Sequence, residues 1–178
     1  ISNLIKDFDN IIIVGGMGNA MLKNTGINIG KSVCDEGYKN LVGEIIEKSE
    51  THNCKIYYPI DVVVSKTLDG NGTIKEITEV NNNEMILDIG PKTIESIKNI
   101  INDTNTVLWN GPAGYFENPN FANGTKKILE IIANKRLKDK IYAVAGGGET
   151  VAVINKFNKL NTFNFVSTAG GAFLEYLE

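Results

Sequence analysis

The 178-residue sequence contains little cysteine, and its two cysteines, Cys34 and Cys54, form neither a disulfide framework nor a cysteine-rich zinc motif. We interpret both as buried or half-buried thiols of a cytoplasmic protein, because disulfides persist mainly in oxidising compartments. We also expect no secretory signal peptide. Histidine occurs once, as His52 in the polar sequence THNC, where we expect an exposed side chain without a catalytic role.

Positive charge is not in excess either, with 18 Lys and Arg against 21 Asp and Glu and a net charge of −3. A nucleic-acid-binding domain needs a basic face, so we expect no nucleic-acid partner. No apolar run approaches the ~18 residues that a membrane-spanning helix requires. We therefore expect no membrane partner.

Glycine is frequent, with 18 residues against four prolines, and much of it follows short apolar runs. Continuous β-branched runs predict buried strands, and apolar stripes at helical spacing predict the helices between them. The expected strands are residues 11–14, 55–58, 61–65, 74–80, 86–89, 106–109, 141–145 and 163–166. The expected helices are residues 19–23, 38–49, 93–101, 122–133, a helix that follows the triple glycine and ends near residue 157, and residues 172–177.

This alternation of strand, glycine turn and helix predicts an α/β protein with a three-layer αβα, Rossmann-like architecture. The sheet is expected to be mostly parallel, and residues 61–80 are expected to form a small antiparallel insertion. Since no linker or low-complexity segment interrupts the chain, residues 1–178 are predicted to form one domain.

Several expected strands end directly in glycine. In an open parallel sheet such ends share one edge, where helices begin with free N–H groups and a partial positive charge. A glycine has no Cβ, so an anion can approach its backbone closely. One glycine pair is more often only a tight turn, but several on one edge predict a phosphate-binding rim. The glycines concerned are Gly15, Gly16, Gly90, Gly111, Gly146, Gly147 and Gly148.

Two known phosphate-binding motifs match only in part. Residues 16–21 begin like a dinucleotide fingerprint, but Met21 stands where a third glycine or alanine should pack the helix on the strand. Residues 26–32 resemble a P-loop, but they have one residue too few between the glycines and no strand before them. We reject both motifs.

Residues 107–117, VLWNGPAGYFE, followed by Phe121, Gly124 and Thr125, resemble the phosphoglycerate kinase family. The segments IIIVGGMGNAMLK, YYPIDVVVS, LDIGPKTI, GGGETVA and FVSTAGGAFLEYLE resemble the same family in the same order. The resemblance covers essentially the whole chain. It corresponds to the C-terminal, nucleotide-binding half of a two-domain enzyme whose N-terminal domain would be absent here.

The resemblance implies a glycolytic kinase that transfers a phosphoryl group reversibly between 1,3-bisphosphoglycerate and ADP, giving 3-phosphoglycerate and ATP. The implied ligands are ADP or ATP, Mg²⁺, and phosphoglycerate bound through the missing N-terminal domain. The family resemblance also implies a monomer. A single half cannot close over both substrates, so this segment alone is predicted to bind MgADP or MgATP but not to turn over.

The resemblance also implies roles for individual residues. The adenine pocket would be lined by Gly15, Gly16 and Gly90, and Glu117 would accept hydrogen bonds from the ribose hydroxyls. Beside the nucleotide phosphates would lie Asn110, Gly111 and Pro112. The phosphate chain and the group in transfer would lie against Gly146, Gly147, Gly148, Glu149 and Thr150. A second anion site, facing the substrate, would contain Ser167, Thr168, Gly170 and Gly171. The implied catalytic residues are Gly147, Gly148, Gly170 and Gly171, whereas Trp109 is expected to be core.

The sequence departs from the family pattern at two of these positions. Glu149 stands where the family usually carries Asp as its Mg²⁺ contact; glutamate still supplies an oxygen ligand, but it is one methylene longer. Ala169 replaces a glycine of the usual STGGG run. Glu149 keeps open the alternative of a non-catalytic nucleotide-binding module. An NAD-dependent oxidoreductase is a less favoured alternative, against which Met21 argues.

Overall fold

The computed structural model describes residues 2–34, 37–138 and 140–169, with the side chains of residues 38 and 39 left out. The chain divides into two compact units, residues 1–93 and 94–178, and each is described by itself. The expectation of one domain over residues 1–178 stays a prediction. The expected last helix, residues 172–177, lies outside the described residues.

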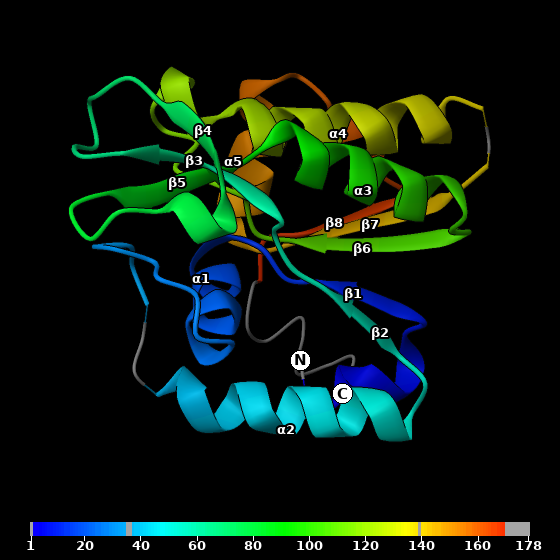
Figure 1. The fold of residues 1–178 in the computed structure, drawn as a ribbon. Coiled ribbons are helices and arrows are strands. Elements are labelled where there is room, and N and C mark those ends of the chain that lie inside the picture. The colour runs from blue at the N-terminus through cyan, green and yellow to red at the C-terminus, as the bar shows by residue number, and fades with distance from the viewer. Residues whose placement is uncertain (1, 35–36, 139, 170–178) are drawn as a thin grey trace. The chain divides into compact units, whose positions relative to one another are not determined.

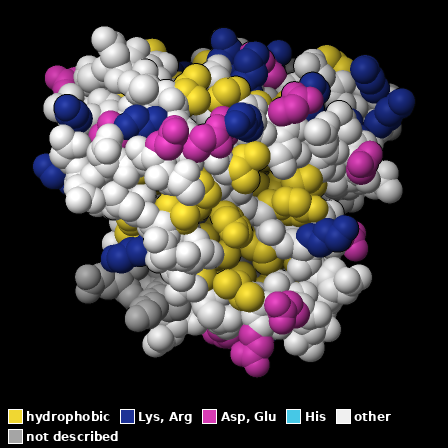
Figure 2. Space-filling model, in the orientation of Figure 1, with side chains coloured by type: hydrophobic (Ala, Val, Ile, Leu, Met, Phe, Trp, Pro, Cys, Tyr) yellow, Lys and Arg dark blue, Asp and Glu magenta, His cyan; other side chains and the backbone are white. Residues whose placement is uncertain are grey.

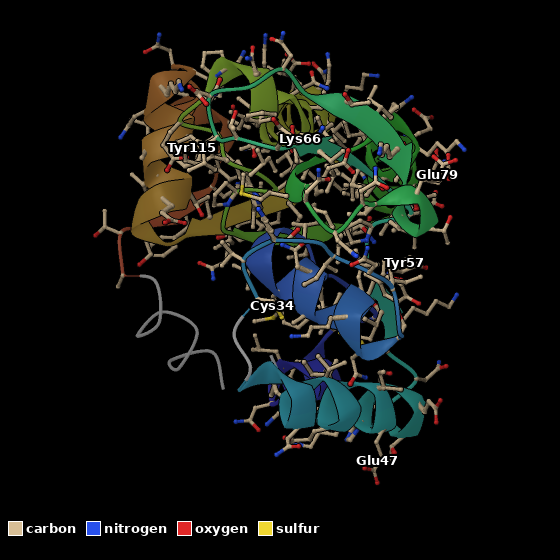
Figure 3. The ribbon with its side chains drawn as sticks, turned by 60° about the vertical axis from the view of Figure 1, so that its left-hand side comes forward. Cys34, Glu47, Tyr57, Lys66, Glu79 and Tyr115 are labelled. Carbon is tan, nitrogen blue, oxygen red and sulfur yellow. The ribbon has the colours of Figure 1, made fainter. Side chains whose placement is uncertain are left out.

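The first unit contains a parallel strand pair with two helices packed near it. Its elements are η1 (Leu4–Asp7), β1 (Asn10–Ile12), α1 (Gly15–Asn24), α2 (Tyr38–Thr51) and β2 (Lys55–Tyr57). In the parallel register of β1 and β2, Ile11 lies opposite Ile56. The apolar stripe predicted for α2 buries Val42 and Ile45 in the same core as Met21 of α1. Cys54 is buried in this core and Cys34 packs against it near α1 (Figure 3).

A small antiparallel sheet completes the first unit. It has the order β4 (Thr73–Glu76), β3 (Asp61–Ser65), β5 (Met85–Ile89), which confirms the antiparallel insertion expected for residues 61–80. The strand predicted to run to residue 80 ends at Glu76, because reciprocal capping between Glu76 and Glu79 starts the short helix η2 (Ile77–Glu79). Strand β5 also belongs to this sheet, since it pairs antiparallel with β3, although the antiparallel insertion was expected to end at residue 80.

The first helix begins earlier than the sequence predicts. Gly15 and Gly16 open α1 instead of forming a turn before it, and Gly15 has a φ of +63°. Within α1, a Cβ on Gly18 would come 3.1 Å from the carbonyl oxygen of Ile13, the residue that follows β1. Glycine therefore allows the start of α1 to pack closely against the strand, although glycine is a poor helix former in isolation.

The second unit is built on a parallel sheet with the order β6 (Thr106–Asn110), β7 (Tyr142–Gly146), β8 (Phe165–Ser167). Its helices are α3 (Pro91–Asn102), which continues from the first unit, α4 (Asn123–Arg136) and α5 (Gly148–Lys156), with the short η3 (Pro119–Phe121) and η4 (Leu160–Thr162). Both α4 and α5 pack against β7 (Figure 1). Parallel sheets, helices and a small antiparallel sheet together confirm the predicted α/β class.

The core of the second unit lies between β7 and the helices α4 and α5. Ala143 and Ala145 of β7 are fully buried, and their small side chains allow the helices to approach the strand closely. Ile132 of α4 and Ile154 of α5 are fully buried as well, each a contribution of about 2–3 kcal/mol from burial of apolar surface. Trp109 is buried and stacks on Phe163 with ring centroids 6.0 Å apart, which confirms Trp109 as a core residue.

Charged side chains of both signs are interspersed over the face of the protein shown in Figure 2. This mixture agrees with the near balance of acidic and basic residues in the sequence. Within the described part of the chain, no helix is both long enough and apolar enough to cross a membrane.

Candidate functional site

The carboxyl ends of β6, β7 and β8 form one edge of the parallel sheet in the second unit. The register places Asn110 opposite Gly146, and Gly146 opposite Ser167. Three segments that are far apart in the sequence therefore end side by side. For this unit, the expectation that the glycine turns share one sheet edge is confirmed.

Gly147 connects β7 to α5 in a conformation that requires glycine. Its φ is +95°, and a Cβ on it would lie 2.8 Å from Oδ1 of Asn110. Its N–H donates to the carbonyl oxygen of Ser167 over 3.1 Å, which ties the turn to β8. Both backbone conformation and close approach thus exclude a side chain at this position.

The amino-terminal turn of α5 carries N–H groups with no partner inside the helix. The first intrahelical bond runs from the N–H of Val151 to the carbonyl oxygen of Gly147, and this N-cap residue has no side chain that could cap the helix. The N–H groups of Gly148 and Glu149 precede that bond, and both residues are exposed at the end of a nine-residue helix. This end can bind an anion, since the aligned peptide dipoles make it partly positive.

Thr150, the third residue of α5, has a structural role that the sequence did not indicate. The residue is fully buried, and its hydroxyl accepts a hydrogen bond from the N–H of Gly111 over 2.6 Å. Gly111 itself has a φ of +104°, and nothing lies within 4 Å of its Cβ position. Glycine is therefore favoured at position 111 by its backbone conformation, and not because a side chain would lack space.

The residues 110–118, here called the 110–118 loop, begin with the last residue of β6 and are held at further points. The hydroxyl of Thr125 in α4 accepts from the N–H of Ala113 over 2.9 Å. The ammonium of Lys156, in the last turn of α5, donates to the carbonyl oxygen of Phe116 over 3.0 Å and lies 5.7 Å from the centroid of its ring. Phe116 is buried, whereas the next residue, Glu117, is exposed.

Tyr115, labelled in Figure 3, belongs to the 110–118 loop and is 37% exposed. The sequence pointed to this loop through Asn110, Gly111, Pro112 and Glu117. It gave no signal for Lys156, because a lysine in the last turn of a helix is usually a solvated residue. The contact depends on two segments that only folding brings together.

Gly90, in the first unit, has a structural explanation of its own. A Cβ on Gly90 would lie 2.3 Å from the carboxylate of Asp61. That carboxylate accepts hydrogen bonds from the N–H of Lys92 over 2.9 Å and of Thr93 over 2.7 Å, and so caps α3. The negatively charged group beside this glycine turn is therefore the carboxylate of Asp61. A role for Gly90 in adenine binding stays a prediction.

The predicted site residues are distributed over both units. Gly15, Gly16 and Gly90 belong to the first unit, and Gly16 has nothing within 4 Å of its Cβ position. The described site residues from Asn110 onward belong to the second unit. Gly170 and Gly171 lie outside the described residues, so the structure describes no contact of theirs.

A cavity of about 590 Å³ lies in the second unit where β6 and β7 begin. It is therefore at the amino ends of these strands, opposite to the carboxyl edge that carries the candidate site. Lys135 in its wall is buried, and its ammonium donates to the carbonyl oxygens of Ile101, Asn102 and Thr104 at the end of α3. Burial lowers the pKa of Lys135. Since the ammonium already binds three carbonyl oxygens, this lysine caps a helix and is not available to an anion.

No three His, Cys, Asp or Glu side chains are grouped as a metal site anywhere in the described ranges. Mg²⁺ in phosphate-transfer sites is commonly held by one or two carboxylates together with the phosphates. Glu149, an exposed carboxylate at the start of α5, fits that arrangement as a single protein ligand.

The second unit has a parallel sheet whose carboxyl edge carries the start of α5 and the firmly held 110–118 loop. It therefore has the architecture of the open α/β domains, a class in which ligands bind at that edge of the sheet. The sequence model of the phosphoglycerate kinase family matches residues 1–178. The chain belongs to the phosphoglycerate kinase family.

Individual relatives agree with this assignment. The phosphoglycerate kinase of Francisella philomiragia is 42% identical over 178 residues, covering 99% of this chain and 44% of the relative. That of Coxiella burnetii is 38% identical over 180 residues, covering 100% of this chain and 45% of the relative. The chain thus spans about half the length of the curated relatives that it matches.

Solved structures show the same fold. The structure of phosphoglycerate kinase from Coxiella burnetii superposes with a TM-score of 0.91 at 38% identity, over 98% of this chain and 45% of that chain. The phosphoglycerate kinase of Pyrococcus horikoshii OT3 superposes with a TM-score of 0.78 at 27% identity, over 98% and 44%.

Proposed function

We propose that this chain is the nucleotide-binding half of a phosphoglycerate kinase. In that role it binds ADP or ATP with Mg²⁺ while a phosphoryl group passes reversibly between 1,3-bisphosphoglycerate and ADP. The observation that carries the proposal is the start of α5 at the sheet edge, where the N-cap Gly147 supplies no side-chain cap, beside the loop that contains the exposed Glu117. Family membership supports the same reaction.

The phosphates of the nucleotide would bind at the start of α5. The N–H groups of the exposed residues Gly148 and Glu149 would supply donors there, and the helix dipole adds partial positive charge. Gly147 brings no side chain into this space. Positioning and charge stabilisation carry most of the catalysis in phosphoryl transfer, so a preorganised set of donors suits this reaction.

The remaining groups would bind the rest of the ligands. The carboxylate of Glu117 would accept hydrogen bonds from the ribose hydroxyls, and Asn110 would lie beside the phosphates. Mg²⁺, when bound, neutralises charge on the phosphates, and Glu149 would be its protein ligand. Gly15, Gly16 and Gly90 would contact adenine, and Gly170 and Gly171 would face the phosphoglycerate substrate.

Phosphoglycerate itself would be bound mainly by an N-terminal domain that is not part of these 178 residues. A site open on that side cannot exclude water, so we expect binding without turnover from this chain. The whole kinase would be a cytoplasmic monomer.

Calorimetric titration of the chain with MgADP, Mg²⁺-free ADP and NAD tests the proposal. We expect binding of ADP, tighter with Mg²⁺, and none of NAD. Preferential binding of NAD would overturn the proposal in favour of an oxidoreductase, and absence of ADP binding would remove its basis.

A coupled assay then separates a kinase from a non-catalytic nucleotide-binding module, which the change from the usual Asp to Glu149 keeps open. The protein encoded by the complete open reading frame should turn over, while this chain alone should not. An inactive complete protein that still binds ADP would favour the non-catalytic module.

A further inference from the structure

Both ends of the 110–118 loop are attached to the same helix. Near the start of α5, the hydroxyl of Thr150 binds the N–H of Gly111 over 2.6 Å. In its last turn, the ammonium of Lys156 binds the carbonyl oxygen of Phe116 over 3.0 Å. A helix rises 1.5 Å per residue, so these attachment points are about 9 Å apart along a rigid rod.

The Lys156 contact acts directly on the backbone that carries Glu117. A peptide group is planar, so the carbonyl oxygen of Phe116 lies in one plane with the amide nitrogen and Cα of Glu117. Holding that oxygen fixes the orientation of this plane. It therefore limits where the Cα of Glu117, and hence its exposed carboxylate, can lie.

Lys156 also lies over the ring of Phe116, with its ammonium 5.7 Å from the ring centroid. Because Phe116 is buried, the ring gives the ammonium a fixed surface to lie against. The lysine is thus held by a carbonyl oxygen and an aromatic ring of one residue. Glu117 follows that residue directly and has its side chain on the outside.

We propose that Lys156 is a positioning residue that sets the Glu117 carboxylate for the ribose hydroxyls of the bound nucleotide by holding the carbonyl of Phe116. The inference rests on the proposed function, because it requires a nucleotide with its ribose at Glu117. Through this contact α5 carries two parts of one site. Its first turn presents the phosphate-binding N–H groups, and its last turn orients the ribose-binding carboxylate.

Calorimetry on the 178-residue chain tests the proposal with three probes: ADP, 2′,3′-dideoxy-ADP and inorganic tripolyphosphate. ADP carries phosphates and ribose hydroxyls, dideoxy-ADP lacks the two hydroxyls, and tripolyphosphate consists of phosphates alone. Lys156→Met removes the donor but keeps most of the side-chain stem. We expect it to weaken ADP binding about threefold to tenfold, the usual range for one hydrogen bond. Binding of dideoxy-ADP and tripolyphosphate should not change, because neither carries ribose hydroxyls.

Matched variants separate positioning from general damage. Lys156→Arg keeps a cationic donor and should restore ADP binding, whereas Lys159→Met removes an exposed lysine nearby and should change nothing. Glu117→Ala should abolish the preference for ADP over dideoxy-ADP. Adding Lys156→Met to Glu117→Ala should then cause no further loss, because both act through one carboxylate.

Two results would overturn the positioning role: an equal weakening of all three probes by Lys156→Met, or unchanged ADP binding. The proposed function fails in a different way, when the unmodified chain binds neither ADP nor tripolyphosphate. A third outcome is that the unmodified chain binds ADP and tripolyphosphate, but Glu117→Ala still prefers ADP over dideoxy-ADP. In that case the assignment of Glu117 to the ribose and the role of Lys156 both fail, while the phosphate site stands. Thermal unfolding of each variant shows whether the fold is retained.

Discussion

Asn110 and Gly147 lie so close together that a Cβ on Gly147 would come within 2.8 Å of the side-chain oxygen of Asn110. Asn110 ends β6 and Gly147 follows β7, and the parallel register of the two strands brings these ends together. The contact makes the turn at Gly147 sensitive to any added side chain.

Gly147→Ala should destabilise the chain by about 1–3 kcal/mol, because alanine is strained at a φ of +95° and its methyl group clashes with Asn110. Chemical denaturation measures the change in the free energy of unfolding. Gly148→Ala is the matched control, since nothing lies within 4 Å of its Cβ position. Equal stability of the two variants would contradict this account of the turn.

Thr150→Val should also be destabilising, by about 1–3 kcal/mol, because it leaves the N–H of Gly111 without the hydroxyl that accepts from it. Thr150→Ser keeps the hydroxyl and should lose less. The unfolding free energies of both variants test this order. Hydrogen exchange at Gly111 should accelerate in Thr150→Val and stay slow in Thr150→Ser, and the reverse order would disprove the role of the hydroxyl.

Asp61→Ala should cost about 2 kcal/mol of unfolding free energy, since the carboxylate caps α3 through the N–H groups of Lys92 and Thr93. Asp69→Ala, at an exposed position, should stay within about 0.5 kcal/mol of the unmodified chain. Urea titration of both variants provides the measurement. The capping role is wrong if the two substitutions have the same effect.

The stability of the first unit should depend on Glu84 at acidic pH. A hydrogen bond from the N–H of Asn81, and then the ammonium of Lys75, lower the pKa of Glu84 below its usual value. The folded state therefore favours the carboxylate, and this stabilisation is present above the unfolded-state pKa of about 4.3. It is lost as the pH falls through the lowered folded-state pKa.

Unfolding of Glu84→Gln and of the unmodified chain should be compared between neutral pH and about pH 2.5. The difference in unfolding free energy should be largest near neutral pH and shrink on acidification. Lys75→Met should weaken this pH dependence without removing it, because the N–H of Asn81 remains as a donor. A difference that is constant over the whole range would contradict the assignment to Glu84.

Much of the fold could be predicted because the signals are local. The β-branched run of residues 61–65 is the strand β3 with the same bounds, and the apolar stripe of residues 38–49 lies within α2. Parallel pairing of β6 and β7 follows from the helix that must connect them. The sheet to which β5 belongs could not be predicted, because strand pairing depends on which partner is available and not on the strand's own pattern.

The candidate site divides in the same way. Motif resemblance pointed to Gly147, Glu149 and Glu117. In the structure, the start of α5 and the 110–118 loop are joined by a hydrogen bond within the second unit. The roles of Thr125, Thr150 and Lys156 in holding that loop were not predicted. Each depends on a hydrogen bond between segments that only folding brings together.

The sequence by itself determined the α/β class, the glycine turns and the family, because these depend on residue order and on local backbone preferences. Only the tertiary structure decided that the carboxylate of Asp61 caps the start of α3. Only it showed that α5 holds the loop carrying Glu117. The physical reason is that a helix start binds whichever acceptor folding brings to it, and residue order alone does not specify that acceptor.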